Sequence, residues 1–198
     1  YFLGHGSNKA YCNFTAVAGT ILVTAAGITF INPRYVTDID AVVSAVVVSG
    51  ADFAEYNVEF YDAAAKAATV QLLTTSGAQR MCINGYRFYE STTGTHKTSG
   101  IQTVGALDGV ILENIEIAGT FSSQPVNLTN AACTNLRLQN LALNNLDTNP
   151  YPALGLHANT TGFAEDVKLR IASGTTYVSN NAKMQWGADC LGYNTDGS

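Results

Sequence analysis

The chain has 198 residues, of which 46% are apolar and only 13% charged, and its formal net charge is −5. The charged fraction is about half of the roughly 25% usual in soluble domains, and 22 Thr, 17 Asn and 18 Gly take the place of charged side chains. This balance argues against a long-helix protein, the ten basic residues give no patch for nucleic acid, and the apolar runs are far shorter than the roughly 20 residues of a membrane helix.

A four-residue unit recurs along the chain, in which a turn-forming residue is followed by an apolar, a variable and a second apolar residue. Its first residues are Gly27, Asn57, Gly85, Asn114, Asn140 and Asp166. Glycine, asparagine and aspartate tolerate the left-handed backbone conformation at the lowest cost. Each of these six positions is therefore predicted to be a structural bend that a short strand follows.

Two further alternating pairs precede the bend in most repeats. The earlier pairs are Ile21/Val23, Val46/Val48, Val70/Leu72, Ile101/Thr103, Val126/Leu128 and Leu154/Leu156, and the later ones are Met81/Ile83, Val110/Leu112 and Leu136/Leu138. Period-2 alternation indicates strands with one buried face. Three strands per repeat predict an all-β chain, a right-handed single-stranded parallel β-helix of about six rungs. The alternative is a β-sandwich or jelly roll, which has no reason to repeat a bend residue every 26 to 30 positions.

The repeat divides the chain into three parts. The β-helix is expected over residues 20–172, with an irregular N-terminal cap or contact segment over 1–19 and a C-terminal cap or oligomer-contact segment over 173–198. Caps are expected because terminal rungs expose open strand edges. The C-terminal segment carries the only tryptophan, and Trp186 and Tyr193 are its candidate contact residues.

The three-sided coil with Asn, Asp or Gly at a bend resembles the right-handed parallel β-helix (pectin-lyase-like) superfamily, which includes pectate lyases, polygalacturonases and bacteriophage tailspikes. The resemblance implies the fold. Polygalacturonase motifs are present only as fragments: Gly4-His5-Gly6 and Asn194-Thr195-Asp196 occur in reversed order at opposite ends, and Arg170-Ile171 is followed by Ala172. We therefore expect no hydrolase activity.

The remaining polar residues favour structural roles. Asp38 and Asp40 have the spacing of two acids on one strand face, but they also suit a solvated loop after Pro33. Glu55, Glu59, Glu113 and Glu116 are expected on the outer face, where Glu59, Arg87 and Glu116 form a charge ladder. The three histidines are far apart, and the four cysteines are expected as free thiols, with a Cys12–Cys190 disulfide as the alternative. No catalytic, cofactor-binding or metal-binding residue is assigned.

A rigid coil with few charges suits a structural or adhesive module, and its Thr/Asn/Ala/Gly-rich style resembles that of bacteriophage virion proteins. The resemblance implies a non-catalytic structural protein of the virion, of head-decoration (cement), fibre or spike type. The resemblance to such proteins implies a homotrimer that contacts other capsid or tail proteins in the virion, with a host-surface glycan as a further ligand. No cofactor, nucleic acid or membrane partner is expected. The alternatives are a carbohydrate-binding or carbohydrate-cleaving β-helix protein, for which outward-pointing tyrosines would stack on sugars, and a fragment of a bacterial surface adhesin.

Overall fold

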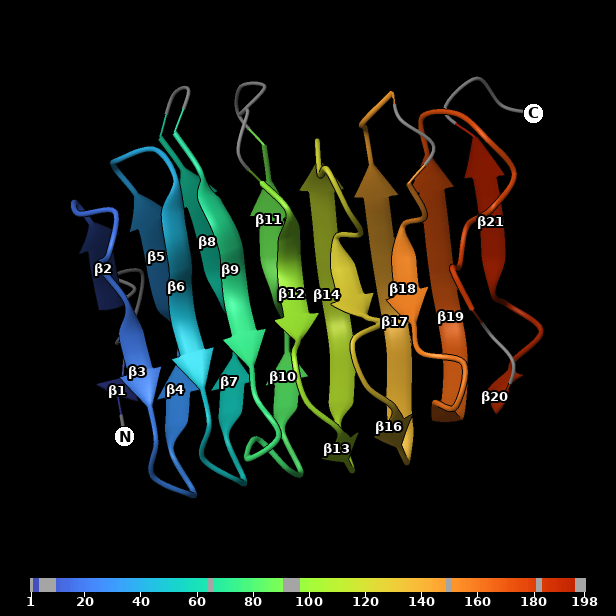
Figure 1. Cartoon of the computed structure of the whole chain (residues 1–198), viewed down its shortest axis with the longest axis horizontal. Coiled ribbons are helices and arrows are strands. Elements are labelled where there is room, and N and C mark those ends of the chain that lie inside the picture. Colours follow the sequence, from blue (N-terminus) through green and yellow to red (C-terminus); the bar gives the residue numbers. More distant parts are fainter. Residues whose placement is uncertain are drawn as a thin grey trace.

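The chain forms a parallel β-solenoid of about seven turns in the computed structural model, which describes residues 2–3, 10–63, 66–90, 97–148, 151–180 and 183–194. The turns stack along one axis from the N-terminal to the C-terminal end (Figure 1). Within the described ranges every residue in regular structure is in a strand or bridge, and none is helical. The predicted all-β, parallel coil is therefore confirmed. Those ranges contain no helix long and apolar enough to cross a membrane.

The strands of the coil form three faces, which follow one another in the same order along the chain. The first face contains β1 (Phe2–Leu3), β4 (Thr29–Ile31), β7 (Ala54–Tyr56), β10 (Cys82–Asn84) and β20 (Lys183–Trp186). The second face contains β2 (Ala10–Phe14), β5 (Pro33–Thr37), β8 (Glu59–Asp62), β11 (Arg87–Tyr89) and β21 (Leu191–Asn194). Three long strands run through both of these faces: β14 (Ile111–Gly119), β17 (Leu136–Asn145) and β19 (Thr161–Ile171).

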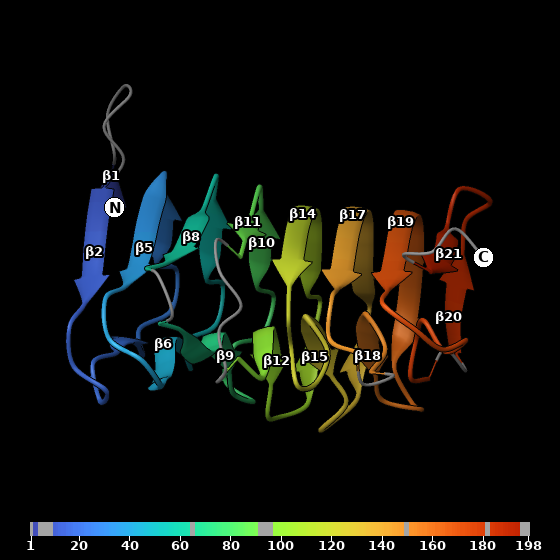
Figure 2. The same ribbon diagram turned by 90° about the horizontal axis from the view of Figure 1, so that it is seen from above.

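The third face is a separate six-stranded sheet that lies opposite the row of second-face strands (Figure 2). Its strands are β3 (Ile21–Val23), β6 (Val42–Val48), β9 (Ala68–Thr74), β12 (Ser99–Thr103), β15 (Val126–Leu128) and β18 (Leu154–Leu156). A short pair, β13 (Leu107–Asp108) with β16 (Cys133–Thr134), lies before the first face of its turns. The pairing register joins Leu72 to Val46 and Thr74 to Val48. The alternating pair of β9 that aligns with the pairs of the other third-face strands is therefore Leu72/Thr74, two residues later than the expected Val70/Leu72.

The six predicted bend residues all have a positive φ, between 49° and 79°. Five of them lie in one column between the first and second faces, because Asn57, Gly85, Asn114, Asn140 and Asp166 follow the first-face residues that pair in register. In the first complete turn this position belongs to Asn32, whose φ is 54°.

Gly27 belongs to a second column of left-handed residues, at the corner where each turn enters the first face. The members of this column are Gly27, Asp52, Arg80, Gly109 and Asn135. The placement of Gly27 in the same column as Asn57 was therefore wrong. Both residues have the left-handed conformation, but Gly27 bends the chain before β4 and Asn32 bends it afterwards. Each left-handed residue of the second column precedes its first-column partner by five positions, as in Arg80 and Gly85.

Asparagine side chains connect the first column from turn to turn. Asn57 Nδ2 donates to Asn32 Oδ1 at 2.7 Å, and Asn140 Nδ2 donates to Asn114 Oδ1 at 2.7 Å. Asn114 Nδ2 donates in turn to Asn84 Oδ1 at 2.9 Å, where Gly85 occupies the bend itself. Asparagine therefore serves twice at these positions, because it tolerates the bend and because its amide bonds the neighbouring turns.

Both terminal segments contribute strands to the coil. β2 pairs in parallel with β5, and β20 and β21 both pair with β19. These strands raise the number of turns to about seven, one more than expected. Trp186 pairs with Ala164 and packs against the apolar core, whereas 43% of Tyr193 is exposed on the second face.

The core is a continuous apolar column inside the coil. The expected inward residues of the later pairs, such as Met81, Ile83 and Leu112, are completely buried. Aromatic rings extend the packing across five turns, with centroids 5.8 to 6.4 Å apart along Phe14, Tyr35, Phe60, Phe88 and Phe121. No turn could bury such residues alone, so the turns stabilise one another.

Replacement of Asn114 tests the left-handed conformation in the first column. We expect Asn114→Val to lower the free energy of unfolding by about 1 to 2 kcal/mol more than Asn114→Gly, because a β-branched residue is strained at positive φ. Both variants lose the same amide hydrogen bonds, so their difference isolates the backbone. Chemical denaturation measures it. Glu116→Val, two residues further along the same strand, is the control and should have little effect; equal stabilities for valine and glycine at 114 would contradict the bend.

Candidate functional site

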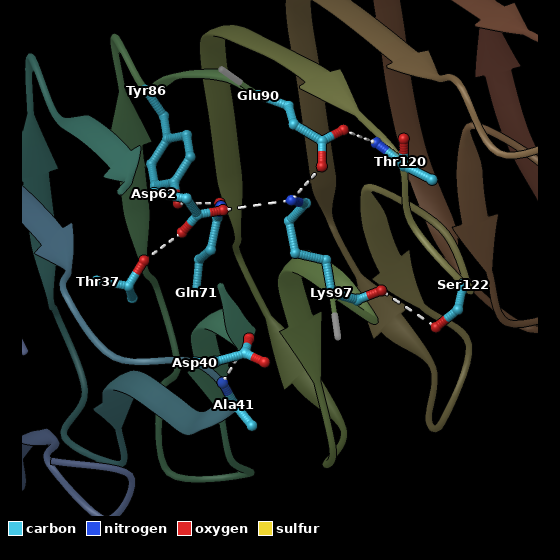
Figure 3. A network of polar contacts seen from close by, with 10 residues as sticks. All are labelled: Thr37, Asp40, Ala41, Asp62, Gln71, Tyr86, Glu90, Lys97, Thr120 and Ser122. Carbon is cyan, nitrogen blue, oxygen red and sulfur yellow. Dashed lines mark hydrogen bonds and ion pairs between the residues drawn. The ribbon is translucent and has the colours of Figure 1, made fainter. Parts of the chain in front are cut away.

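A group of ionisable side chains lies inside the coil, where the second face ends. Asp62 ends β8 two positions after Phe60, and Glu90 follows β11 two positions after Phe88, the register partner of Phe60. Lys97 precedes β12 and extends back toward both carboxylates (Figure 3). The side chains of Lys97, Asp62 and Glu90 are only 0%, 4% and 6% exposed. We call these three residues the buried ionic cluster.

The contacts within the buried ionic cluster are short and specific. Lys97 Nζ lies 2.5 Å from Glu90 Oε1 and 3.4 Å from Asp62 Oδ2. Thr37, in the preceding turn, donates its hydroxyl to Asp62 Oδ1. The backbone N–H of Thr120, in the following turn, donates to Glu90 Oε2 at 2.6 Å. The cluster therefore joins four successive turns through side chains.

Phe88 covers the amine, since Lys97 Nζ lies 5.6 Å from its ring centroid. Burial raises the pKa of the Asp62 carboxyl, although the hydrogen bond from Thr37 and the charge of Lys97 act in the opposite direction. Breaking such a cluster by removing one partner would leave a buried charge uncompensated, which is strongly destabilising.

A second buried acid lies on the first face. Glu55 of β7 is completely buried and pairs in register with Phe30 and Ile83, so it occupies a core position. The Tyr35 hydroxyl donates to Glu55 Oε1 at 2.5 Å, and no residue in the described part of the chain hydrogen-bonds to Glu55 Oε2. Desolvation raises the pKa of Glu55 to about 7. The expectation that Glu55 lies on the outer face was therefore wrong.

The expected charge ladder on the outer second face has the predicted register. Arg87 pairs with Glu59 on one side and with Glu116 on the other. Arg34 extends the ladder by one turn, and its Nε lies 3.0 Å from Glu59 Oε2. Exposed pairs of this kind contribute little to stability. They do give the surface alternating charges of opposite sign.

Two tyrosines accompany the ladder. Tyr61 and Tyr89 are adjacent in neighbouring strands, and they are 41% and 51% exposed. They line a surface hollow of about 360 Å³ together with Arg34, Glu59 and Arg87. Burial and a hydrogen bond to Glu116 raise the pKa of Tyr89 to about 12. Tyr86 and Phe88, in contrast, are buried in the core.

A second, smaller hollow continues along the same face. Its volume is about 160 Å³, and it lies between Tyr89 and Tyr193, where the lining residues include Ala118, Ala142 and Arg170. The Arg170 guanidinium lies 5.9 Å from the Tyr193 ring centroid. In the pairing register, Ala118, Asn144 and Arg170 separate Tyr89 from Tyr193.

The other candidate residues are dispersed. Asp38 and Asp40 lie in the loop between β5 and β6, where Asp38 pairs with Lys66 at 3.4 Å and Asp40 accepts a hydrogen bond from the N–H of Ala41. His157 follows β18 and accepts a hydrogen bond from the N–H of Asn159. Gly4-His5-Gly6, His96 and the Thr195-Asp196 part of the last motif lie outside the described residues.

The cysteines do not form a site. Cys12, Cys82, Cys133 and Cys190 are all free thiols, as expected, and Cys12 and Cys190 belong to opposite ends of the coil. Among the residues that the structure describes, no group of three or more His, Cys, Asp or Glu side chains is arranged to hold a metal ion.

Sequence and structure comparisons add no relative. No protein-family model, no curated protein and no solved structure matches the chain. Membership of the pectin-lyase-like superfamily therefore remains a hypothesis, separate from the observed parallel solenoid.

The burial of Glu55 predicts a dependence of stability on pH. Its pKa is about 7 in the folded protein and 4.5 ordinarily, so folding favours the protonated acid. We expect the free energy of unfolding of the wild type, relative to Glu55→Gln, to be highest below pH 4.5 and to fall by up to about 3 kcal/mol as the pH rises to about 7.

Denaturant titrations of both proteins between pH 4 and pH 8 measure this difference. Glutamine retains the acceptor for Tyr35, so the variant is a matched control. A difference that is constant over this pH range would contradict the assignment.

Proposed function

We propose that the chain is a non-catalytic structural module of a bacteriophage virion, a solenoid rod of head-decoration, fibre or spike type. The supporting observation is that its charged and amide side chains bond one turn to the next. Three ion pairs join neighbouring turns: Arg34–Glu59, Arg80–Asp52 and Lys66–Asp38. The asparagine hydrogen bonds along the first column also join neighbouring turns. Bonds between successive turns resist bending of the solenoid, as a structural rod requires.

The proposal includes threefold self-association on the particle. The surface has few charges, and its neutral faces suit packing around a symmetry axis. The last strand offers the exposed apolar side chains of Leu191 and Tyr193, which are 58% and 43% exposed. Trp186, the other expected contact residue, is partly buried against the core.

The virion proposal predicts that the chain is present in purified particles and turns over no polysaccharide. Mass spectrometry of purified virions measures the first. The second is measured by following reducing ends and unsaturated products during incubation with acidic and neutral polysaccharides. Turnover that Asp38→Asn or Asp40→Asn abolishes would contradict the non-catalytic role. Absence from particles, with recovery from a bacterial surface fraction, would favour the adhesin alternative.

A carbohydrate-binding role is the second candidate, and the tyrosines of the second face favour it. Tyr61 and Tyr89 present adjacent rings beside a hollow, and aromatic rings combine an apolar face with a polar edge. The flanking Arg34, Glu59, Arg87 and Glu116 alternate in charge. This alternation favours a neutral oligosaccharide, whose hydroxyl groups both donate and accept hydrogen bonds.

The carbohydrate role predicts that Tyr89→Ala weakens binding to a neutral oligosaccharide by about tenfold, the equivalent of about 1.4 kcal/mol of lost contact. Calorimetric titration against a panel of neutral and acidic oligosaccharides measures the affinity. Tyr151→Ala is the matched control, because Tyr151 is also exposed, at 39%, but lies outside the second face. Equal loss in both variants would contradict the assignment, as would binding to none of the panel.

A further inference from the structure

The buried ionic cluster brings an amine and two carboxyl groups together in a space that water does not reach. Lys97 Nζ contacts Glu90 Oε1 at 2.5 Å and Asp62 Oδ2 at 3.4 Å, and all three side chains are at least nine-tenths buried. We propose that Lys97 and Asp62 condense within the folded chain to form an isopeptide bond between Lys97 Nζ and Asp62 Cγ.

The surroundings of Lys97 suit a nucleophile. A lysine attacks a carbonyl carbon only as the neutral amine, so a proton acceptor must lie beside it. The Lys97 side chain is 0% exposed, and the Phe88 ring lies beside its Nζ. Glu90 is within hydrogen-bonding distance and so can accept the proton that the ammonium must lose.

The surroundings of Asp62 suit the electrophile. A carboxyl group loses water to an amine only when it is protonated, and desolvation raises the pKa of Asp62 in that direction. The Thr37 hydroxyl donates to Asp62 Oδ1, where negative charge develops during attack. Oδ2, on the side of Lys97, is then the leaving oxygen.

Glu90 lies closer to the amine than Asp62 does. Lys97 Nζ is 2.5 Å from Glu90 Oε1 but 3.4 Å from Asp62 Oδ2, and the N–H of Thr120 holds Glu90 in place by donating to Oε2. This arrangement suits a base. The two acids therefore have separate roles, with Asp62 as the carbon that is attacked and Glu90 as the group that transfers protons.

The step balances without a further reactant. Glu90 removes one proton from the Lys97 ammonium, and the free electron pair of Nζ forms a bond with Asp62 Cγ. Glu90 then passes this proton to the Oδ2 hydroxyl, the Cγ–Oδ2 bond breaks, and one water molecule leaves. Glu90 takes a second proton from Nζ, so the products are a neutral amide, a neutral Glu90 carboxyl and water. The reaction removes the charges from the interior, where unneutralised charge is costly.

Intact mass spectrometry of the denatured full chain tests the proposal. We expect the mass to be lower than that of the sequence by one water molecule, with proteolysis giving one branched peptide that contains Asp62 and Lys97. The matched control is the Lys66–Asp38 pair, which has the same 3.4 Å separation of Nζ and Oδ1 but side chains that are 41% and 48% exposed. Peptides containing Lys66 and Asp38 should remain separate.

Three variants separate the roles. Lys97→Arg should retain the full mass, and so should Glu90→Gln, because it lacks the proton acceptor. Asp62→Asn should still form the bond but lose ammonia instead of water, a signature that no static ion pair produces and that does not depend on the other variants folding. A wild-type chain that is folded by circular dichroism and has the full sequence mass would overturn the proposal, as would a branch at Glu90.

Discussion

The structure depends on a backbone constraint that is repeated in five successive turns: two left-handed residues, five positions apart, bend the chain into and out of the first face. The spacing between them does not change from Gly27 and Asn32 to Asn135 and Asn140. The four-residue segments between them are therefore aligned in register from one turn to the next. Parallel hydrogen bonds, the asparagine bonds and the apolar core all require this coincidence. The same constraint accounts for the residue types in the two columns, which are glycine, asparagine and aspartate except at Arg80.

Arg80 shows how the solenoid accommodates a poorly suited residue. Its φ is 54°, and its guanidinium binds Asp52 of the same column through two hydrogen bonds, at 2.6 and 2.8 Å. In the second column an ion pair therefore links two neighbouring turns, whereas neutral asparagine amides link the turns in the first column. Inside the coil charged residues are also accommodated by pairing. Asp62, Glu90 and Lys97 are buried together, and the amine of Lys97 contacts both carboxylates.

The sequence was sufficient for the fold because the bend residues and the alternating pairs repeat at nearly constant intervals. Register was harder to predict: Gly27 and Asn32 are both acceptable left-handed residues, and only the strand pairing separates their columns. The buried acids were missed although a signal existed. Glu55 stands two positions before Asn57, as the buried Ile83 does before Gly85, and Asp62 stands two positions after the buried Phe60. For Glu55 and Asp62 the acidic side chain suggested a surface location, whereas the position in the repeat indicated the core. Lys97 had no such signal, because it precedes its strand at the end of a long connection.

The constant first face also determines where the chain can change in length. Successive residues of the first column, from Asn32 to Asp166, are 25 to 29 residues apart, and the difference lies in the corners on either side of the third face. A residue added at such a corner moves no strand of the next turn out of alignment. Insertions and deletions during evolution are thereby confined to the two edges of the rod, where new loops can be gained or exchanged while the faces between them keep their pattern.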